Sequence, residues 1–167
     1  EITTLIYDIY YDESKQDAYW HGFYFVPKEN KEYLLNLLHK ARENCNYFTQ
    51  IHYEKIKGKT KLNHGRAAIV SSWTSIGIAA LQQQKYYTSI PKVFLGKTNH
   101  RETFYDKIDK LIKCKFAIFK ERDNHENMYF KDDNLRNIEI TFKMGLKAAL
   151  HRLFSVKEPI TVNKIFI

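Results

Sequence analysis

Residues 3–14 read TTLIYDIYYDES, which joins a strand-forming run to an acidic end and gives the strongest indication of the fold. β-Branched and aromatic residues dominate residues 3–12, which predicts a strand that ends at Asp12. Residues 13–17 are polar and predict a turn, and residues 18–26 predict a second strand. Because the connection is short, we expect the two strands to pair as an antiparallel hairpin.

After this hairpin, helical and strand patterns alternate along the chain. Apolar residues recur at helical spacing in three long segments, and a shorter helix is expected from about residue 99. The long helices are predicted over residues 28–45, 65–84 and 134–154. Further strands are predicted over residues 47–56, 92–96, 115–121 and 160–167. The sequence therefore predicts an α/β fold with a mixed central sheet and helices packed on its faces.

Length and composition favour one domain over residues 1–167, with no visible linker or repeat. The formal net charge is +8, which favours nucleic acid as a partner. No apolar run reaches the ~20 residues that cross a bilayer, and no signal peptide is visible, so we expect a soluble cytoplasmic protein without a membrane partner. Cys45 and Cys114 are expected to be reduced thiols. The sequence also allows a homodimer.

The acidic run Asp12-Glu13-Ser14 is the first candidate site. Hard cations such as Mg²⁺ prefer oxygen ligands, and a strand end holds such ligands rigidly. The period of two places Asp8 and Asp12 on one strand face and Glu13 on the other. The alternative is a solvated turn that happens to be acidic.

His52 and Glu54 form the second candidate site. They lie two residues apart on the strand predicted over residues 47–56, so they face the same side of the sheet. Such a pair can bind a metal or act as base and ligand. The alternative is an exposed polar face of an edge strand.

Basic residues around Gly58 form the third candidate site. They lie before and at the start of the helix predicted over residues 65–84, where they are expected to contact phosphate. They are Lys57, Lys59, Lys61, His64 and Arg66. The glycine spacing of a P-loop is absent, and a solvated basic loop is the alternative. The 12 Tyr and 11 Phe do not by their number predict a base-stacking platform, because most must serve in the core or in strands.

Three motifs carry a resemblance to a known family. They are residues 10–14 (YYDES), the apolar strand at residues 22–27 (GFYFVP), and residues 51–54 (IHYE). In this order they resemble the bacterial family called domain of unknown function 3800. The resemblance implies a ribonuclease H-like fold and phosphodiester hydrolysis with Mg²⁺ or Mn²⁺, in which Asp12 is similar in placement to the first metal-binding aspartate.

The chain departs from that pattern in two places. The helix over residues 65–84 carries no acidic residue, so Glu54 or Glu13 would have to replace the helix-borne glutamate of a ribonuclease H site. The last strand stops at Ile167, where the resemblance implies another carboxylate, and we expect the natural chain to continue.

The leading hypothesis is a metal-dependent nuclease that cleaves RNA or DNA. Its expected catalytic residues are Asp12, Glu54, Glu13 and His52, and its expected metal ligands are Asp12, Glu54 and Glu13. The alternative is a catalytically inactive module of a bacterial defence or mobile-element system that binds nucleic acid or another protein.

Overall fold

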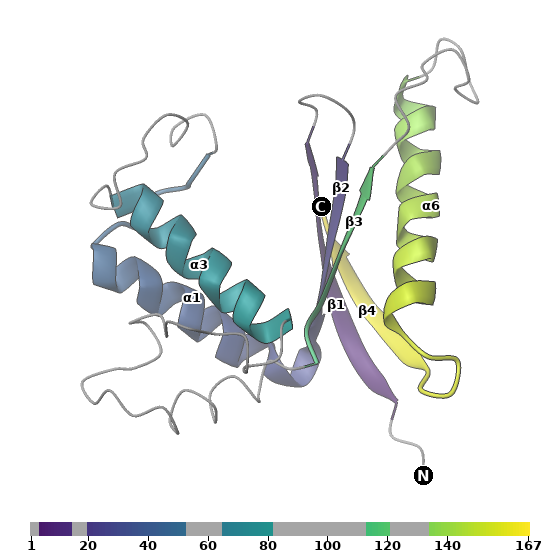
Figure 1. The fold of residues 1–167 in the computed structure, drawn as a ribbon, viewed down its shortest axis with the longest axis horizontal. Helices are drawn as coiled ribbons and strands as arrows, with labels where there is room; N and C mark the ends of the chain where they lie inside the picture. The colour runs from purple at the N-terminus through teal and green to yellow at the C-terminus, as the bar shows by residue number, and fades with distance from the viewer. Residues whose placement is uncertain (1–3, 15–19, 53–64, 82–112, 121–133) are drawn as a thin grey trace. The chain divides into compact units, whose positions relative to one another are not determined.

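The computed structural model describes residues 4–14, 20–52, 65–81, 113–120 and 134–167 (Figure 1). The chain forms two compact units. Glu1–Lys28 and Cys114–Ile167 make the sheet unit, and Glu29–Lys113 makes the helical unit. The chain thus leaves the sheet unit after its second strand and returns to it at Cys114.

The sheet unit contains a four-stranded mixed sheet with one long helix. Its strands are β1 (Leu5–Ser14), β2 (Trp20–Pro27), β3 (Lys115–Lys120) and β4 (Ile160–Phe166), in the spatial order β3-β2-β1-β4. β1 pairs antiparallel with β2, and β2 pairs antiparallel with β3. β4 runs parallel to β1, with a register shift between Tyr7 and Asp8. The predicted α/β class, the mixed sheet and the opening hairpin are confirmed.

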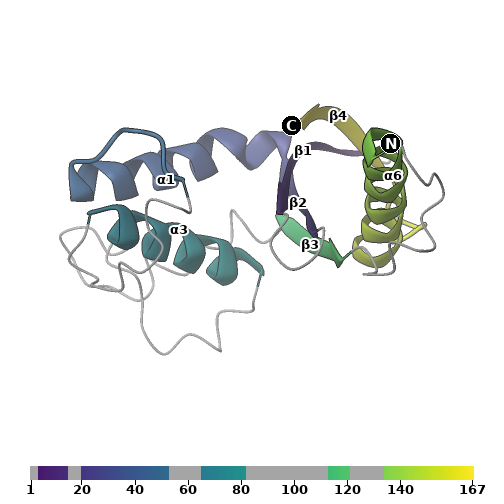
Figure 2. The ribbon, with the colours of Figure 1, turned by 90° about the horizontal axis from the view of Figure 1, so that it is seen from above.

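The core of the sheet unit lies between the sheet and helix α6 (Asn134–Leu153), which Figure 2 shows against one face of the strands. Tyr7 and Ile9 of β1 and Phe23 and Phe25 of β2 are buried there, because alternate residues of a strand share a face. Phe154, just after α6, packs edge-on against Tyr7 and Phe25, with ring centroids 5.0 and 5.3 Å apart. Burying one such side chain contributes about 1.5–3 kcal/mol.

Gly145 lets α6 approach β3 closely. A Cβ atom at this position would lie 3.1 Å from the Cβ, Cγ and Cδ1 atoms of Phe119. The helical spacing of apolar residues predicted over 134–154 gives α6 one apolar face, and four residues of this face pack in the core. These are Phe142, Leu146, Ala149 and Leu153.

The helical unit contains α1 (Lys31–Cys45), preceded by the 3-10 turn η1 (Lys28–Asn30), and α3 (Gly65–Leu81). The indole Nε1 of Trp73 donates a hydrogen bond to the carbonyl oxygen of Leu38, 3.0 Å away. The Arg42 guanidinium lies over the Trp73 ring, 4.7 Å from its centroid. Side chains on α1 and α3 therefore hold the two helices together.

The strand predicted over residues 47–56 is wrong for residues 47–52, which form no regular element. Asn46 ends α1 in the left-handed conformation, with φ at 46°. Arg42 then donates to the carbonyl oxygens of Tyr47 and Thr49, at 3.3 and 2.9 Å. These carbonyls are thus satisfied by a side chain of α1 instead of a strand ladder, a local contact that β-propensity does not register.

Other predicted elements lie close to the observed ones. The strands over residues 3–12, 18–26, 115–121 and 160–167 correspond to β1, β2, β3 and β4. The strand over 92–96 and the helix from about residue 99 lie outside the described residues. In the part of the chain that is described, no helix is long and apolar enough to span a membrane. Cys45 and Cys114 are both free thiols.

Candidate functional site

The acidic run lies inside β1 rather than after it. β1 continues to Ser14 because Asp12, Glu13 and Ser14 pair with Gly22, His21 and Trp20 of β2. The strand end predicted at Asp12 is therefore two residues short. Both carboxylates remain exposed at the end of the strand, as the sequence suggested.

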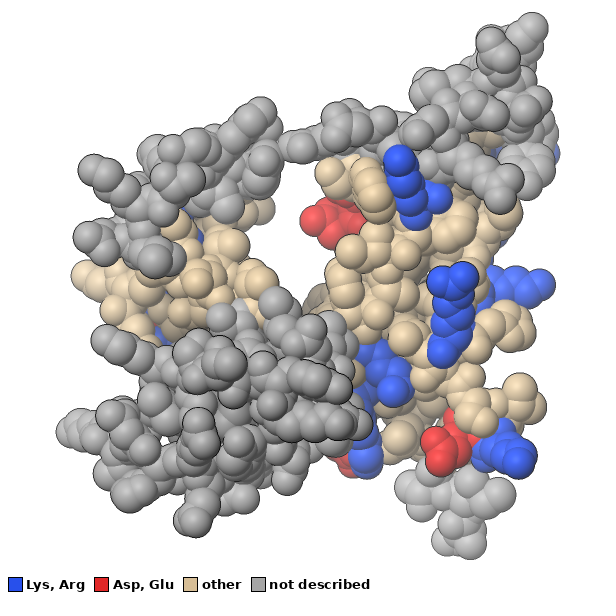
Figure 3. Space-filling view, in the orientation of Figure 1, with Lys and Arg blue, Asp and Glu red and all other residues tan. Residues whose placement is uncertain are grey.

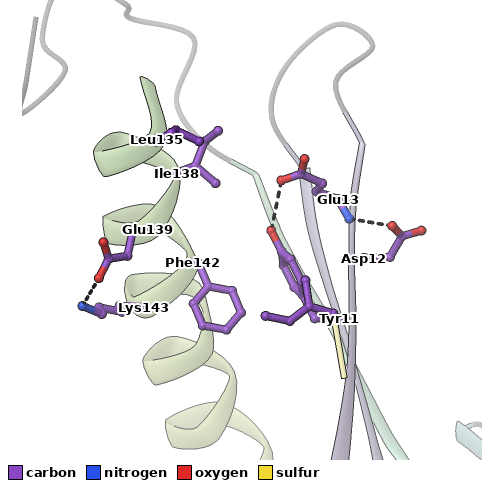
Figure 4. A pocket seen from close by; sticks show the side chains of 9 residues that line it. Tyr11, Asp12, Glu13, Leu135, Ile138, Glu139, Phe142 and Lys143 are labelled. Atoms are coloured by element: carbon purple, nitrogen blue, oxygen red, sulfur yellow. Dashed lines mark hydrogen bonds and ion pairs between the residues drawn. The ribbon is translucent and has the colours of Figure 1, made fainter. Parts of the chain in front are cut away.

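A pocket of about 570 Å³ opens between this end of β1 and the first half of α6 (Figure 4). We call it the acidic pocket, because three carboxylate residues are among those that line it. Its lining residues are Tyr11, Asp12, Glu13, Leu135, Ile138, Glu139, Phe142, Lys143 and Ile167. Ile167 follows β4, so the end of the parallel strand reaches the same place as the acidic end of β1.

Asp12 is held by the backbone of its neighbour. The backbone N–H of Glu13 donates a hydrogen bond of 2.9 Å to Asp12 Oδ1. This contact limits the rotation of the carboxylate, which Figure 4 shows on the side of β1 away from α6, and leaves its oxygens as hydrogen-bond acceptors. A carboxylate oriented in this way suits a metal ligand or a general base.

Glu13 is connected to a buried histidine through Tyr11. The Tyr11 hydroxyl lies 3.4 Å from Glu13 Oε2 and 2.8 Å from Nδ1 of His21, which is fully buried. When Tyr11 donates to Glu13, the bond between His21 and Tyr11 requires Nδ1–H as its donor. The Tyr11 ring also packs edge-on against Phe142 of α6, at 4.8 Å. Packing therefore holds the phenol that contacts Glu13.

Glu139 brings a third carboxylate to the pocket from α6. Lys143 lies one turn further along and pairs with it, with Nζ 2.6 Å from Glu139 Oε1. The hydrogen bond from Lys143 and its charge lower the pKa of the Glu139 carboxyl. Figure 4 shows this pair on the helix side of the pocket, with Glu13 and Asp12 on the strand side. Glu139 is therefore ionised at neutral pH, and a metal ion would have to compete with Lys143 for it.

Sequence reasoning missed Glu139 and Lys143. The prediction sought the helix-borne glutamate in the helix over residues 65–84, which has no acidic residue. The usable signal was in the last helix, where Glu139 follows Ile138 and precedes Phe142 by three positions, at the edge of the apolar stripe. A residue at that edge lies close to the sheet and still reaches solvent.

The other predicted site residues lie in the helical unit or outside the described residues. His52 is exposed in the irregular segment after α1. Arg66 of α3 donates through Nε to the Tyr47 hydroxyl at 2.6 Å, and its guanidinium lies 5.3 Å from the Tyr47 ring centroid. Glu54, Lys57, Lys59, Lys61 and His64 lie outside the described residues. The joint site of Asp12 and Glu54 therefore stays a prediction.

The donor set of the acidic pocket fits a hard divalent cation. All three of its acidic side chains offer carboxylate oxygens, the ligand type of Mg²⁺ and Mn²⁺. Within the described ranges, no three His, Cys, Asp or Glu side chains are grouped closely enough to hold a metal ion together. Mg²⁺ is commonly held by one or two carboxylates plus waters and substrate phosphate, so one carboxylate at the end of β1 is enough to anchor an ion.

Comparison of the chain with protein-family models, with curated proteins and with solved structures gave no match.

Proposed function

We propose that this protein is a divalent-metal-dependent nuclease of ribonuclease H-like fold. One observation carries the proposal: Asp12 and Glu13 of β1 and Glu139 of α6 line a single pocket. Carboxylate oxygens brought together from a strand and a helix can hold the metal ion that assists phosphodiester hydrolysis.

The sheet supports the fold part of this proposal. It opens with an antiparallel hairpin, and β4 lies parallel to β1 on the other side. The family resemblance also implied a glutamate on a helix, and α6, which connects β3 to β4 in the chain order, carries Glu139. Glu139 is therefore a candidate for the helix-borne glutamate that the helix over residues 65–84 lacks.

Asp12 would anchor the metal, Mg²⁺ or Mn²⁺, with water and substrate phosphate as further ligands, and Glu13 and Glu139 would add negative charge nearby. When bound, the metal supplies neutralising charge for the phosphate and acidifies a coordinated water. Asp12 presents an oxygen fixed by the Glu13 backbone N–H. Tyr11 restrains the Glu13 carboxylate, and Lys143 keeps Glu139 ionised while adding a cation beside the phosphate position.

Metal-dependent cleavage by the Asp12→Asn variant tests the proposal. The wild-type chain should cleave labelled RNA or DNA with Mg²⁺ or Mn²⁺ and stop in chelator. Asp12→Asn should reduce cleavage to background, because the amide offers no charge to a metal. Glu32→Gln, a similar charge removal at an exposed position on α1, should retain full cleavage. Unchanged cleavage by Asp12→Asn would show that the site is wrongly assigned.

A catalytically silent binding module is the second candidate. The ion pair between Glu139 and Lys143 favours it, because a lysine that neutralises this carboxylate competes with a metal ion. Salt-sensitive binding of nucleic acid that persists in chelator, with no cleavage under any metal, would support this candidate instead.

A further inference from the structure

The sheet face turned away from α6 carries a row of aromatic side chains across all four strands. Phe116, Tyr24, Tyr10 and Phe166 are successive partners in register on β3, β2, β1 and β4. Tyr10 and Phe166 are stacked, with centroids 4.8 Å apart and an interplanar angle of 9°. The ring centroids of Phe116 and Tyr24 lie 6.1 Å apart. Sequence composition did not predict this row, because only strand register brings its members together.

A hollow lies beside this row, at the position where β2 has a glycine. Gly22 is the partner of Asp12 on β1 and of Ile118 on β3, and it leaves space where a side chain would stand. The resulting cavity of about 410 Å³ is called the Gly22 hollow. It is lined by Tyr10, Tyr11, Asp12, Glu13, Ser14, Trp20, Gly22, Tyr24, Phe116 and Ile118.

Two flat rings with accessible surface flank the hollow. Trp20 is 38% exposed and Phe116 is 40% exposed. Lys120 is the register partner of Trp20, and its Nζ lies 5.2 Å from the centroid of the indole ring. The hollow therefore combines aromatic faces, one adjacent cation and the carboxylate rim of Asp12 and Glu13.

This combination fits an unpaired nucleobase better than an aliphatic ligand. Every base has a π-face that stacks on aromatic side chains, and Lys120 beside the hollow complements the phosphate that accompanies each base. A lipid or other wholly apolar ligand would bury the carboxylates of Asp12 and Glu13 at a cost. Bases within a duplex are already stacked on their neighbours, so a single strand is required.

The distribution of charge does not by itself mark a binding groove. On the face drawn in Figure 3, the Lys and Arg side chains of the sheet unit are spread out and do not form one stripe along a groove. The net charge of +8 still attracts nucleic acid in general. Aromatic stacking is then the feature that distinguishes the region around Asp12.

We propose that the Gly22 hollow binds an unpaired base of a single-stranded nucleic acid. The inference rests on the proposed nuclease function, since the acidic pocket and the hollow share Tyr11, Asp12 and Glu13 at the end of β1. A base seated between Trp20 and Phe116 places its phosphodiester at these carboxylates. The substrate class is thus single-stranded RNA or DNA, with the base next to the cleaved bond held by stacking.

Binding in chelator, where no cleavage occurs, tests the inference separately from catalysis. Fluorescence anisotropy would measure the affinity for labelled single-stranded RNA, single-stranded DNA and the corresponding duplexes. Trp20→Ala and Phe116→Ala should each weaken single-strand binding about 10-fold, the scale of one lost base–aromatic stack. Trp20→Phe should retain most of the affinity. Phe48→Ala removes an exposed aromatic ring from the helical unit and should have no effect.

A direct reporter of stacking is available because the chain has two tryptophans. In a Trp73→Phe variant the fluorescence comes from Trp20 alone, and a single strand should quench it more than a duplex does. If circular dichroism shows that Trp20→Ala does not fold, the affinity of Phe116→Ala and the quenching of Trp20 fluorescence test the inference instead. The inference is overturned if Trp20→Ala and Phe116→Ala bind as tightly as Phe48→Ala, or if duplex and single strand quench equally.

The outcomes separate the two proposals. Loss of binding in Trp20→Ala without any metal-dependent cleavage by the wild-type chain would uphold the stacking site and refute the nuclease. Cleavage that depends on Asp12 but not on Trp20 or Phe116 would uphold the nuclease and refute the stacking site. The RNA and DNA arms show which backbone the site accepts.

Discussion

Glu139 is the residue on which the nuclease proposal depends most after Asp12. Glu139→Gln keeps the shape of the side chain and removes its charge, so metal affinity and cleavage should fall about 10- to 100-fold. Cleavage rates over a range of Mn²⁺ concentrations would measure both effects. Glu158→Gln makes the same change at an exposed position away from the pocket and should match wild type. Equal loss in both variants would argue against a specific role for Glu139.

A second prediction at the residue scale concerns Asp8, which is only 2% exposed. Asn163 Nδ2 donates a hydrogen bond of 2.8 Å to Asp8 Oδ1, and this bond joins β4 to β1 at their register shift. Asn163→Ala should lower the free energy of unfolding by about 1–3 kcal/mol, because it removes a donor from a buried carboxyl group. Urea denaturation would measure the change.

Asn36→Ala is the matched control for that measurement, since Asn36 is exposed on α1. It should leave stability unchanged or slightly raised, because alanine favours helix more than asparagine does. Similar losses in the two variants would contradict a special contribution from the contact between Asp8 and Asn163.

At the scale of elements, the close approach of α6 to β3 should limit substitution at Gly145. Gly145→Val should lower the free energy of unfolding by about 1–3 kcal/mol, because a Cβ atom at this position would stand 3.1 Å from the Cβ of Phe119 and the valine methyl groups would crowd that ring. Thermal and urea unfolding would measure this. Lys147→Val places the same side chain at an exposed position of α6 and should cost only about 0.5 kcal/mol. Equal costs would refute the packing argument.

The contact between β2 and the start of β3 gives stability a pH dependence. Burial raises the pKa of the Cys114 thiol from 9.0 to about 11, although its hydrogen bond with Tyr24 acts in the opposite direction. Burial also raises the pKa of Tyr24. Between pH 9 and 10 the unfolded thiol is losing its proton while the folded one retains it. The free energy of unfolding should therefore fall as pH rises, by up to about 1.4 kcal/mol per pH unit.

Urea unfolding between pH 8 and 10 would measure this slope. Cys114→Ala should flatten it, since the titrating thiol is then absent. Burial also raises the pKa of Tyr33, from 10.0 to about 12, and this effect enters near pH 10 in wild type and Cys114→Ala alike, so it does not account for a difference between the two slopes. A slope that is the same in wild type and in Cys114→Ala would exclude the thiol as its cause.

Most described elements could be predicted because their residues carry the period of the element. The strand-forming run of β1 and the apolar stripe of α6 are such patterns. The segment from Tyr47 to Thr49 could not be predicted in this way. Arg42 donates hydrogen bonds to two of its carbonyl oxygens, and the periodicity of the sequence gives no indication of that contact. Glu139 was missed for a related reason: the pattern shows a helix face, but packing decides which pocket that face meets.

At the scale of the whole molecule, the sheet unit gathers the features that the proposals use. The acidic pocket lies on the α6 side of β1 and the Gly22 hollow on the other side, and the end of β1 belongs to both. The sequence supplied Asp12 and Glu13 as candidates, whereas the aromatic row needed the register of four strands. Residues far apart in the chain, such as Tyr10 and Phe166, become neighbours only through that topology.

The most direct test of the central claim is the location of bound Mn²⁺ by anomalous X-ray scattering from crystals of the wild-type chain soaked in that ion. An anomalous peak is expected within coordinating distance of the Asp12 carboxylate, and no peak there is expected in Asp12→Asn crystals. A peak at some other group of carboxylates, or none in the acidic pocket at millimolar Mn²⁺, would contradict the central claim.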